Sequence, residues 1–224
     1  MKKFFSLTAL FALQFIFAQD VIRELAPFTE VKVYDRISAE LIKSDQNKVE
    51  ITGARSQEVE VLQKKDELKI RMPFSKLLKG EDISVKIYYS GKLNEIEAYE
   101  GSFITSQDVI SVFDLELEVK EGAEIKLEIV VNELEVKAVT GGFIHLSGEV
   151  KGEMKASIKT GGELQAQKLQ TKRTTVSISA GGEAEIYATD YVKARVKAGG
   201  DIRIYGKPAY IDQKTIVGGT ITLK

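Results

Sequence analysis

Three stretches decide the fold: VKAVTGGFIHL at residues 136–146, ASIKTGGELQA at 156–166 and VSISAGGEAEI at 176–186. Each has a glycine pair at its centre, and apolar residues alternate with mostly polar ones on both sides of that pair. Alternation with a period of two predicts a β-strand with one buried face. Each stretch therefore predicts two half-buried strands joined by a tight corner.

The same unit recurs about every twenty residues in the second half of the chain. The first glycines stand at positions 101, 122, 141, 161, 181, 199 and 218, and in the first two units Ser102 and Ala123 replace the second glycine. A unit this short cannot bury its apolar face alone, so each strand is predicted to pair with its equivalent in the next unit. The sequence thus predicts an all-β fold, a right-handed parallel β-helix (a β-solenoid) with glycine-marked coils of about twenty residues from about residue 96.

Glycine suits such a corner for two reasons. A sharp bend favours a positive φ, and stacked coils leave little space for a Cβ atom. A leucine-rich repeat has a similar period, but its leucine and asparagine pattern is absent, and a propeller blade needs roughly twice this length.

Residues 27 to about 95 lack the glycine corner but also predict strands. Alternating segments lie at 31–34, 37–42, 48–52, 58–62, 68–72 and 83–89, with turn-like polar groups between several of them. We expect hairpins or irregular coils, continuous with the solenoid, that cap its N-terminal end. Residues 28–224 are therefore predicted to form a single domain.

The first 18 residues have the pattern of a secretory signal peptide. Lys2 and Lys3 precede an apolar run, and Ala18 offers a small residue at the predicted cleavage site. The alternative is an uncleaved membrane anchor. Residues 19–27 would form a short lead into the domain, and no later stretch approaches ~18 consecutive apolar residues, so no transmembrane segment is predicted in the exported chain.

Composition removes several classes of chemistry. The chain has no cysteine and one histidine, which excludes disulfides, thiolate metal sites and multi-histidine metal sites. Its 32 Lys and Arg residues balance 33 Asp and Glu residues. This balance, with no aromatic-plus-basic motif, argues against a nucleic-acid partner.

The order of motifs resembles a known family. Phe28-Thr29-Glu30-Val31 opens the domain, the alternating motif at 49–53 follows, and the segment 93–98 leads into Glu100-Gly101-Ser102 and the glycine-pair coils. This arrangement is similar to the putative auto-transporter adhesin, head GIN domain, of exported Bacteroidetes proteins. The resemblance covers about residues 28–224. It implies a β-helical fold, export and an envelope or surface role, and it carries no catalytic residue to transfer.

The single histidine does not predict catalysis. His145 lies between two apolar residues of the alternating pattern, so its side chain should face solvent, and no motif places a serine and an aspartate around it. Acids and bases recur with the repeat and do not gather at one coil. We therefore predict no catalytic residue and no cofactor, with a polysaccharide-active enzyme as the weakest alternative.

Two outward columns carry charge. Glu163, Glu183 and Asp201 each stand two residues after a glycine, and stacking would bring them into an acidic ladder. Calcium is one candidate for relieving the repulsion, whereas Arg203 or solvent screening would suffice without a metal, which is the interpretation we favour. Before the corners, outward residues are largely basic and offer either a surface for an anionic glycan or simple solubility: Lys120, Lys137, Lys159, Arg195, Lys197 and Lys214.

The sequence predicts an exported, non-catalytic module of the cell envelope, an adhesin or glycan-binding protein in the periplasm or at the cell surface or outer membrane. Its expected partner is a polysaccharide or an envelope protein. The alternative is a periplasmic scaffold that forms homo-oligomers by pairing through its C-terminal coil.

Overall fold

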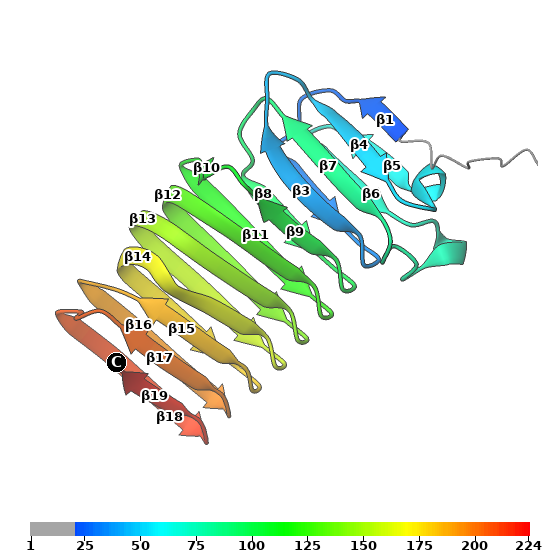
Figure 1. The fold of residues 1–224 in the computed structure, drawn as a ribbon. Coiled ribbons are helices and arrows are strands. Elements are labelled where there is room, and N and C mark those ends of the chain that lie inside the picture. Colours follow the sequence, from blue (N-terminus) through cyan, green and yellow to red (C-terminus); the bar gives the residue numbers. More distant parts are fainter. Residues whose placement is uncertain (1–20) are drawn as a thin grey trace, which may run out of the picture.

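The computed structural model describes residues 21–224, and strands make up nearly all of its regular structure. Its nineteen strands form a curled, mixed N-terminal sheet and a β-solenoid of about six turns that extends from this sheet (Figure 1). The predicted all-β solenoid is thus confirmed. The strands are β1 (Val21–Glu24), β2 (Glu30–Val33), β3 (Ser38–Lys43), β4 (Lys48–Thr52), β5 (Glu60–Lys64), β6 (Glu67–Arg71), β7 (Ser84–Tyr89), β8 (Glu95–Ala98), β9 (Phe103–Ser106), β10 (Ile110–Ser111), β11 (Asp114–Lys120), β12 (Glu124–Val139), β13 (Phe143–Lys159), β14 (Glu163–Ile178), β15 (Glu183–Tyr187), β16 (Tyr191–Ala198), β17 (Asp201–Tyr205), β18 (Tyr210–Val217) and β19 (Thr220–Leu223), with two short 3₁₀ helices, η1 (Ser56–Glu58) and η2 (Phe74–Lys76).

The solenoid has two parallel faces that meet at the glycine corners. The pre-glycine sheet holds β6, β2, β8, β11, the second halves of β12, β13 and β14, then β16 and β18. The post-glycine sheet holds β7, β3, β9, the first halves of β12, β13 and β14, then β15, β17 and β19. The three longest strands therefore run through both faces and bend between them.

The register stacks like residues above one another. Ile125 pairs with Ile144, Ile144 with Leu164, and Leu164 with Ala184. All four side chains are fully buried. Burying an aliphatic side chain contributes about 1.5–3 kcal/mol, so a continuous ladder of this kind stabilises the whole stack.

The two glycines of a corner meet different constraints. Gly141 and Gly161 have φ of +70° and +74°, with open space where a Cβ atom would lie. At Gly162 a Cβ atom would lie 2.3 Å from the carbonyl oxygen of Ala138 in the preceding coil. The first glycine is thus required by conformation and the second by space. In the degenerate unit Ser102 takes the second position, where its hydroxyl donates to the carbonyl of Val33 at 2.8 Å.

The N-terminal coils do not stack in sequence order. The coil of β2 and β3 lies between the coil of β6 and β7 and the coil of β8 and β9. Strand β4 runs antiparallel to β7, and β5 runs antiparallel to β6. Residues 19–27, predicted as a lead, contain β1, which pairs with β4. The predicted signal peptide at 1–18 lies outside the described residues.

The first coil turns without glycine. Asp35 and Arg36 have φ of +61° and +63° at the corner between β2 and β3. The buried Asp35 carboxylate accepts the backbone N–H of Met72 at 3.0 Å and of Leu78 at 2.9 Å. These bonds fix the loop between β6 and β7 against the corner and offset the cost of its left-handed backbone.

The last coil is less covered than the others. Strands β18 and β19 each pair on one side only within residues 21–224. Large apolar side chains are exposed there, at Tyr210, Ile216, Val217 and Leu223. Within the same residues, no helix is long and apolar enough to cross a bilayer.

Candidate functional site

The predicted acidic ladder is assembled by the register. Glu163 pairs with Glu183, and Glu183 pairs with Asp201, on the outer surface of the post-glycine sheet. Arg203 contacts Glu183 at 3.0 Å and Glu185 at 3.2 Å, and Gln165 donates to Glu163 at 2.8 Å. The repulsion is therefore relieved by neighbouring side chains. Among residues 21–224, no three His, Cys, Asp or Glu side chains gather in a way that could hold a metal ion.

His145 faces outward, as the alternation predicts. Its ring packs edge-on against Phe143, with centroids 4.2 Å apart, and its Nε2 lies 3.6 Å from Glu124. Buried Ile144 and Leu146 flank it in the strand. The histidine therefore belongs to the surface of the post-glycine sheet.

The predicted basic column needs correction. Lys120 pairs with Glu118 at 2.7 Å, and Lys137 pairs with Glu116 and Glu135. In the N-terminal coils the lysines of this column thus neutralise glutamates on the same face. The predicted column left out the glutamates at other outward positions of these coils, Glu116, Glu118 and Glu135. Lys159, Arg195, Lys197 and Lys214 lie further along, on the C-terminal coils.

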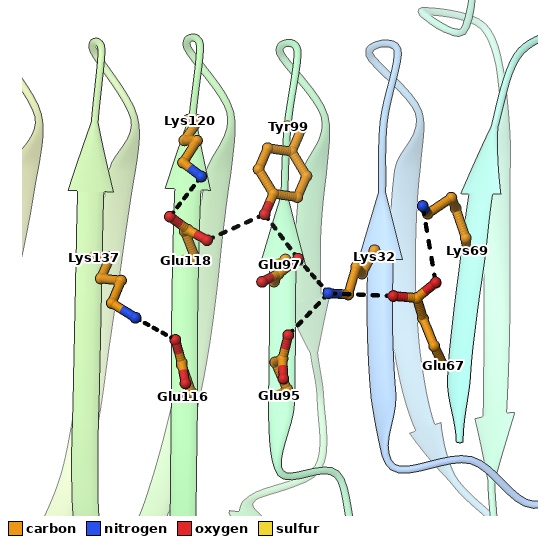
Figure 2. A network of polar contacts seen from close by, with 10 residues as sticks. All are labelled: Lys32, Glu67, Lys69, Glu95, Glu97, Tyr99, Glu116, Glu118, Lys120 and Lys137. Carbon is orange, nitrogen blue, oxygen red and sulfur yellow. Dashed lines mark hydrogen bonds and ion pairs between the residues drawn. The ribbon is translucent and has the colours of Figure 1, made fainter. Parts of the chain in front are cut away.

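A network of charged side chains crosses the pre-glycine sheet at these N-terminal coils (Figure 2). Lys32 is its centre, with Nζ 3.0 Å from carboxylate oxygens of both Glu95 and Glu97 and 3.3 Å from Glu67. Tyr99 donates its hydroxyl to Glu97 at 2.7 Å and lies 3.2 Å from Glu118. Strands β6, β2, β8 and β11 are thereby linked by side chains as well as by backbone bonds.

Burial sets the ionisation of this network. Glu97 is 6% exposed, and its burial raises the pKa of its carboxyl group above the ordinary value. Burial opposes the charge of Lys32, but the hydrogen bonds that Lys32 donates to Glu95 and Glu97 outweigh this effect and raise the pKa of the ammonium group. Burial also raises the pKa of Tyr34, whose ring stacks on Tyr99, to about 12. These groups have one another as partners, so the network is structural.

The post-glycine sheet carries a different surface. A polar groove of about 410 Å³ crosses four adjacent strands where they bend. Its lining comes from β9, β12, β13 and β14: Thr105, Ser106, Lys126, Leu127, Glu128, His145, Leu146, Ser147, Gln165, Gln167 and Lys168. We call these residues the polar groove.

Most polar side chains of the groove are free to bind. Within residues 21–224, six of them have no hydrogen-bonding or ion-pair partner: Thr105, Lys126, Glu128, Ser147, Gln167 and Lys168. In contrast to the Lys32 network, these donors and acceptors are turned to solvent. The groove can therefore supply several hydrogen bonds to one ligand.

A β-bulge shapes the groove. His145 pairs with Gln165 but Ser147 pairs with Lys168, so Ala166 and Gln167 together oppose Leu146. A bulge bends its strand and redirects a side chain, and here it places Gln167 and Lys168 at the hollow. The sequence contains the signal, because two polar residues separate buried Ala166 from buried Leu169 where strict alternation allows one. Aligning the repeats on their glycines did not reveal the bulge.

Comparison with known proteins agrees with this architecture. The family model described as "Putative auto-transporter adhesin, head GIN domain" matches residues 27–208. The chain belongs to this family. The resemblance found in the sequence is thus confirmed. The description of the family as a putative adhesin agrees with an exported protein.

Solved structures share the head GIN fold. A putative adhesin from Bacteroides fragilis is 18% identical, with a TM-score of 0.86 over 93% of this chain and 98% of that chain. A putative adhesin from Parabacteroides distasonis is 24% identical, with a TM-score of 0.71 over 92% and 96%. Another protein of that species, described as a putative lipid binding protein, is 18% identical with a TM-score of 0.68 over 92% and 96%. No curated protein matches the sequence.

Proposed function

We propose that this head GIN chain is a non-catalytic binding module of the cell envelope, and that its polar groove binds a glycan. One observation carries the proposal: six polar side chains without partners in residues 21–224 gather in a single hollow on an otherwise regular sheet. Family membership supports the adhesin role.

The chemistry of the groove suits a ligand rich in hydroxyl groups. Lys126 and Lys168 donate hydrogen bonds, Glu128 accepts them, and the amide of Gln167 does both. Each sugar hydroxyl also donates and accepts. Neighbouring strands lie about 4.8 Å apart, so a groove crossing four of them follows an extended chain rather than a compact molecule.

The groove does not have the arrangement of a glycosidase. Those enzymes place two carboxyl groups on either side of the scissile bond. Glu128 is the one carboxylate among the lining residues, and His145 contributes an imidazole without a serine or second acid beside it in the lining. The groove is therefore equipped to hold a glycan without cleaving it.

A glycan array tests this function. The exported protein should bind one class of polysaccharide fragment, and the double variant Gln167→Ala, Lys168→Ala should bind it at least about fivefold more weakly, since each lost hydrogen bond contributes about 0.5–1.5 kcal/mol. The matched control is Lys86→Ala, Lys207→Ala, which alters two exposed residues outside the groove and should bind like the wild type.

Calcium and a chelator form the second arm of the array. Because Arg203 and Gln165 already contact the acidic ladder, binding should be the same in both conditions. Loss of binding in chelator would instead support a metal at Glu163, Glu183 and Asp201. Equal binding by the groove variant and the wild type would contradict the groove as the site.

The scaffold function remains a second candidate because the last coil exposes apolar side chains beside two open strand edges. Tyr210 donates its N–H to Asp190, so alternation along β18 turns the N–H of Thr215 toward the open edge. Thr215→Pro would block pairing at that edge without removing a bond to β16. If the scaffold candidate is right, this variant should lose a self-association that the wild type shows.

A further inference from the structure

The outer face of the pre-glycine sheet is divided into two halves of opposite charge. The segments in β8, β11 and residues 133–139 of β12 carry seven carboxylates and two lysines, a net charge of −5. The segments at 153–159 of β13 and 173–178 of β14, with β16 and β18, carry seven basic residues and two carboxylates, a net charge of +5. We call these the acidic end and the basic end.

The acidic end is hollowed and keeps an excess of negative charge. A depression of about 410 Å³ is lined by six carboxylates, among them Asp114, Glu116 and Glu133. Lys32 and Lys137 pair with some of the six, but exposed Asp114 has no partner within residues 21–224. This excess is available to a cationic surface.

The basic end is exposed and flat. Lys193, Lys197 and Lys214 are exposed and have no ion-pair partner among the described residues. Tyr191 and Tyr210 stack with their rings 5.6 Å apart and almost parallel, at 3°, which gives these lysines a rigid neighbour. Small uncharged side chains, such as Ser157 and Ser177, lie on the β13 and β14 segments of the basic end and allow close approach there.

We propose that this face binds a second copy of the chain with the coil order reversed. A two-fold axis along the strand direction brings the acidic end of each copy over the basic end of the other. A two-fold axis along the solenoid would place like charges opposite one another. The inference is independent of the proposed glycan function, because the polar groove lies on the other sheet.

A second copy fits both halves of the face, whereas a polyanion fits one. An acidic polymer bound along the basic end would meet the repulsion of the acidic end a few strands away. Opposite charge across the interface steers association and fixes the orientation. Because the charges are exposed in the monomer, the association should weaken as salt increases.

Analytical ultracentrifugation tests the proposal with charge-reversed variants. The wild-type protein should sediment as a dimer in about 0.05 M salt and as a monomer in about 1 M salt, where the Debye length falls to about 3 Å. Variant A, Lys193→Glu with Lys214→Glu, and variant B, Asp114→Lys with Glu133→Lys, should each be monomeric in low salt. The control Lys86→Glu, Lys207→Glu has the same charge change as variant A and should dimerise like the wild type.

The decisive arm is an equal mixture of variants A and B. Variant A keeps the acidic end at −5 but reduces the basic end to +1, and variant B keeps the basic end at +5 but reduces the acidic end to −1. Only the mixture joins a full acidic end to a full basic end, so it should form heterodimers although neither variant associates alone. Circular dichroism should show that both remain folded, since all four changes lie on the outer surface.

Four outcomes would overturn the proposal. They are a wild type that stays monomeric in low salt, a dimer that survives both charge reversals, a dimer abolished by Thr215→Pro alone, and a mixture of variants A and B that stays monomeric. A monomeric wild type that binds dextran sulfate through the basic end would identify a polyanion as the occupant instead.

Discussion

The two glycines of a corner are required for different physical reasons. Gly161 has a left-handed backbone and open space around its Cβ position, whereas Gly162 has its Cβ position filled by the backbone of the coil before it. The sequence predicted both reasons but did not assign them to the two positions. The assignment required the distances between coils, which no local pattern contains.

Alanine substitution at each glycine distinguishes the effect of backbone conformation from that of limited space. Gly161→Ala should destabilise the protein by about 1–2 kcal/mol, the cost of a left-handed alanine. Gly162→Ala should cost more, above about 2 kcal/mol, because its Cβ atom meets the Ala138 carbonyl at 2.3 Å and the backbone must shift. Urea denaturation midpoints of the two variants provide the measurement. Equal midpoints would mean that space between coils does not limit the corner.

At the scale of elements, the strands of the first half were predicted within one or two residues at most ends, but their order was not. Alternation identifies a strand and its buried face, whereas the partner of a strand depends on contacts distant in sequence. The coil of β2 and β3 therefore lies between two later coils without any local signal. The basic column was wrong in the N-terminal coils because Lys120 pairs with Glu118 of its own strand and Lys137 pairs with Glu116 of the adjacent strand.

The Lys32 network joins these reordered strands, and its contribution should depend on pH. The raised pKa of Lys32 means that its own charge stabilises the fold below its unfolded pKa and is lost only when the pH rises through the folded value, in the alkaline range. For Glu97 the raised pKa means that the neutral form of the carboxyl group, present at acid pH, is the one that favours the fold. Its ionisation costs stability as the pH rises above about 4.3, and Lys32 offsets that cost.

Lys32→Met should therefore destabilise the protein by about 2 kcal/mol at pH 7. This is less than the cost of breaking a fully buried ion pair, because Lys32 and Glu95 are partly exposed. The loss should shrink at about pH 4, where Glu97, whose pKa is raised by burial, takes up a proton and no longer needs the charge of Lys32. Thermal midpoints at both pH values measure it. Lys69→Met is the matched control, since Lys69 approaches Glu67 only at 3.8 Å. A loss that is the same at both pH values would argue against the ion pairs as its source.

At the scale of the whole molecule, stability comes from ladders that run through successive coils. The periodic glycines made this architecture predictable, because a repeat of this length has few ways to bury its apolar face. The polar groove was not predictable from the same columns. It arises where a bulge breaks the period that identified the solenoid.

A charge in a ladder should abolish folding. Ile144→Asp and Ile178→Asp each place a carboxylate at a fully buried position between two coils, where its desolvation has no compensating partner. Ser177→Asp, on the outer surface beside Ile178, is the control and should fold. Circular dichroism and thermal melting distinguish the three proteins. Cooperative, wild-type-like melting of both ladder variants would refute the register.

Hydrogen–deuterium exchange of the exported protein, with and without the polysaccharide fragment selected on the array, tests whether the polar groove is the binding site. The fragment should slow exchange in residues 126–128, 145–147 and 165–168, around the polar groove. Exchange in β16 and β18 should stay unchanged. Slower exchange in β16 and β18, with unchanged exchange around the groove, would rule out the groove as the binding site and place the binding surface on the other sheet.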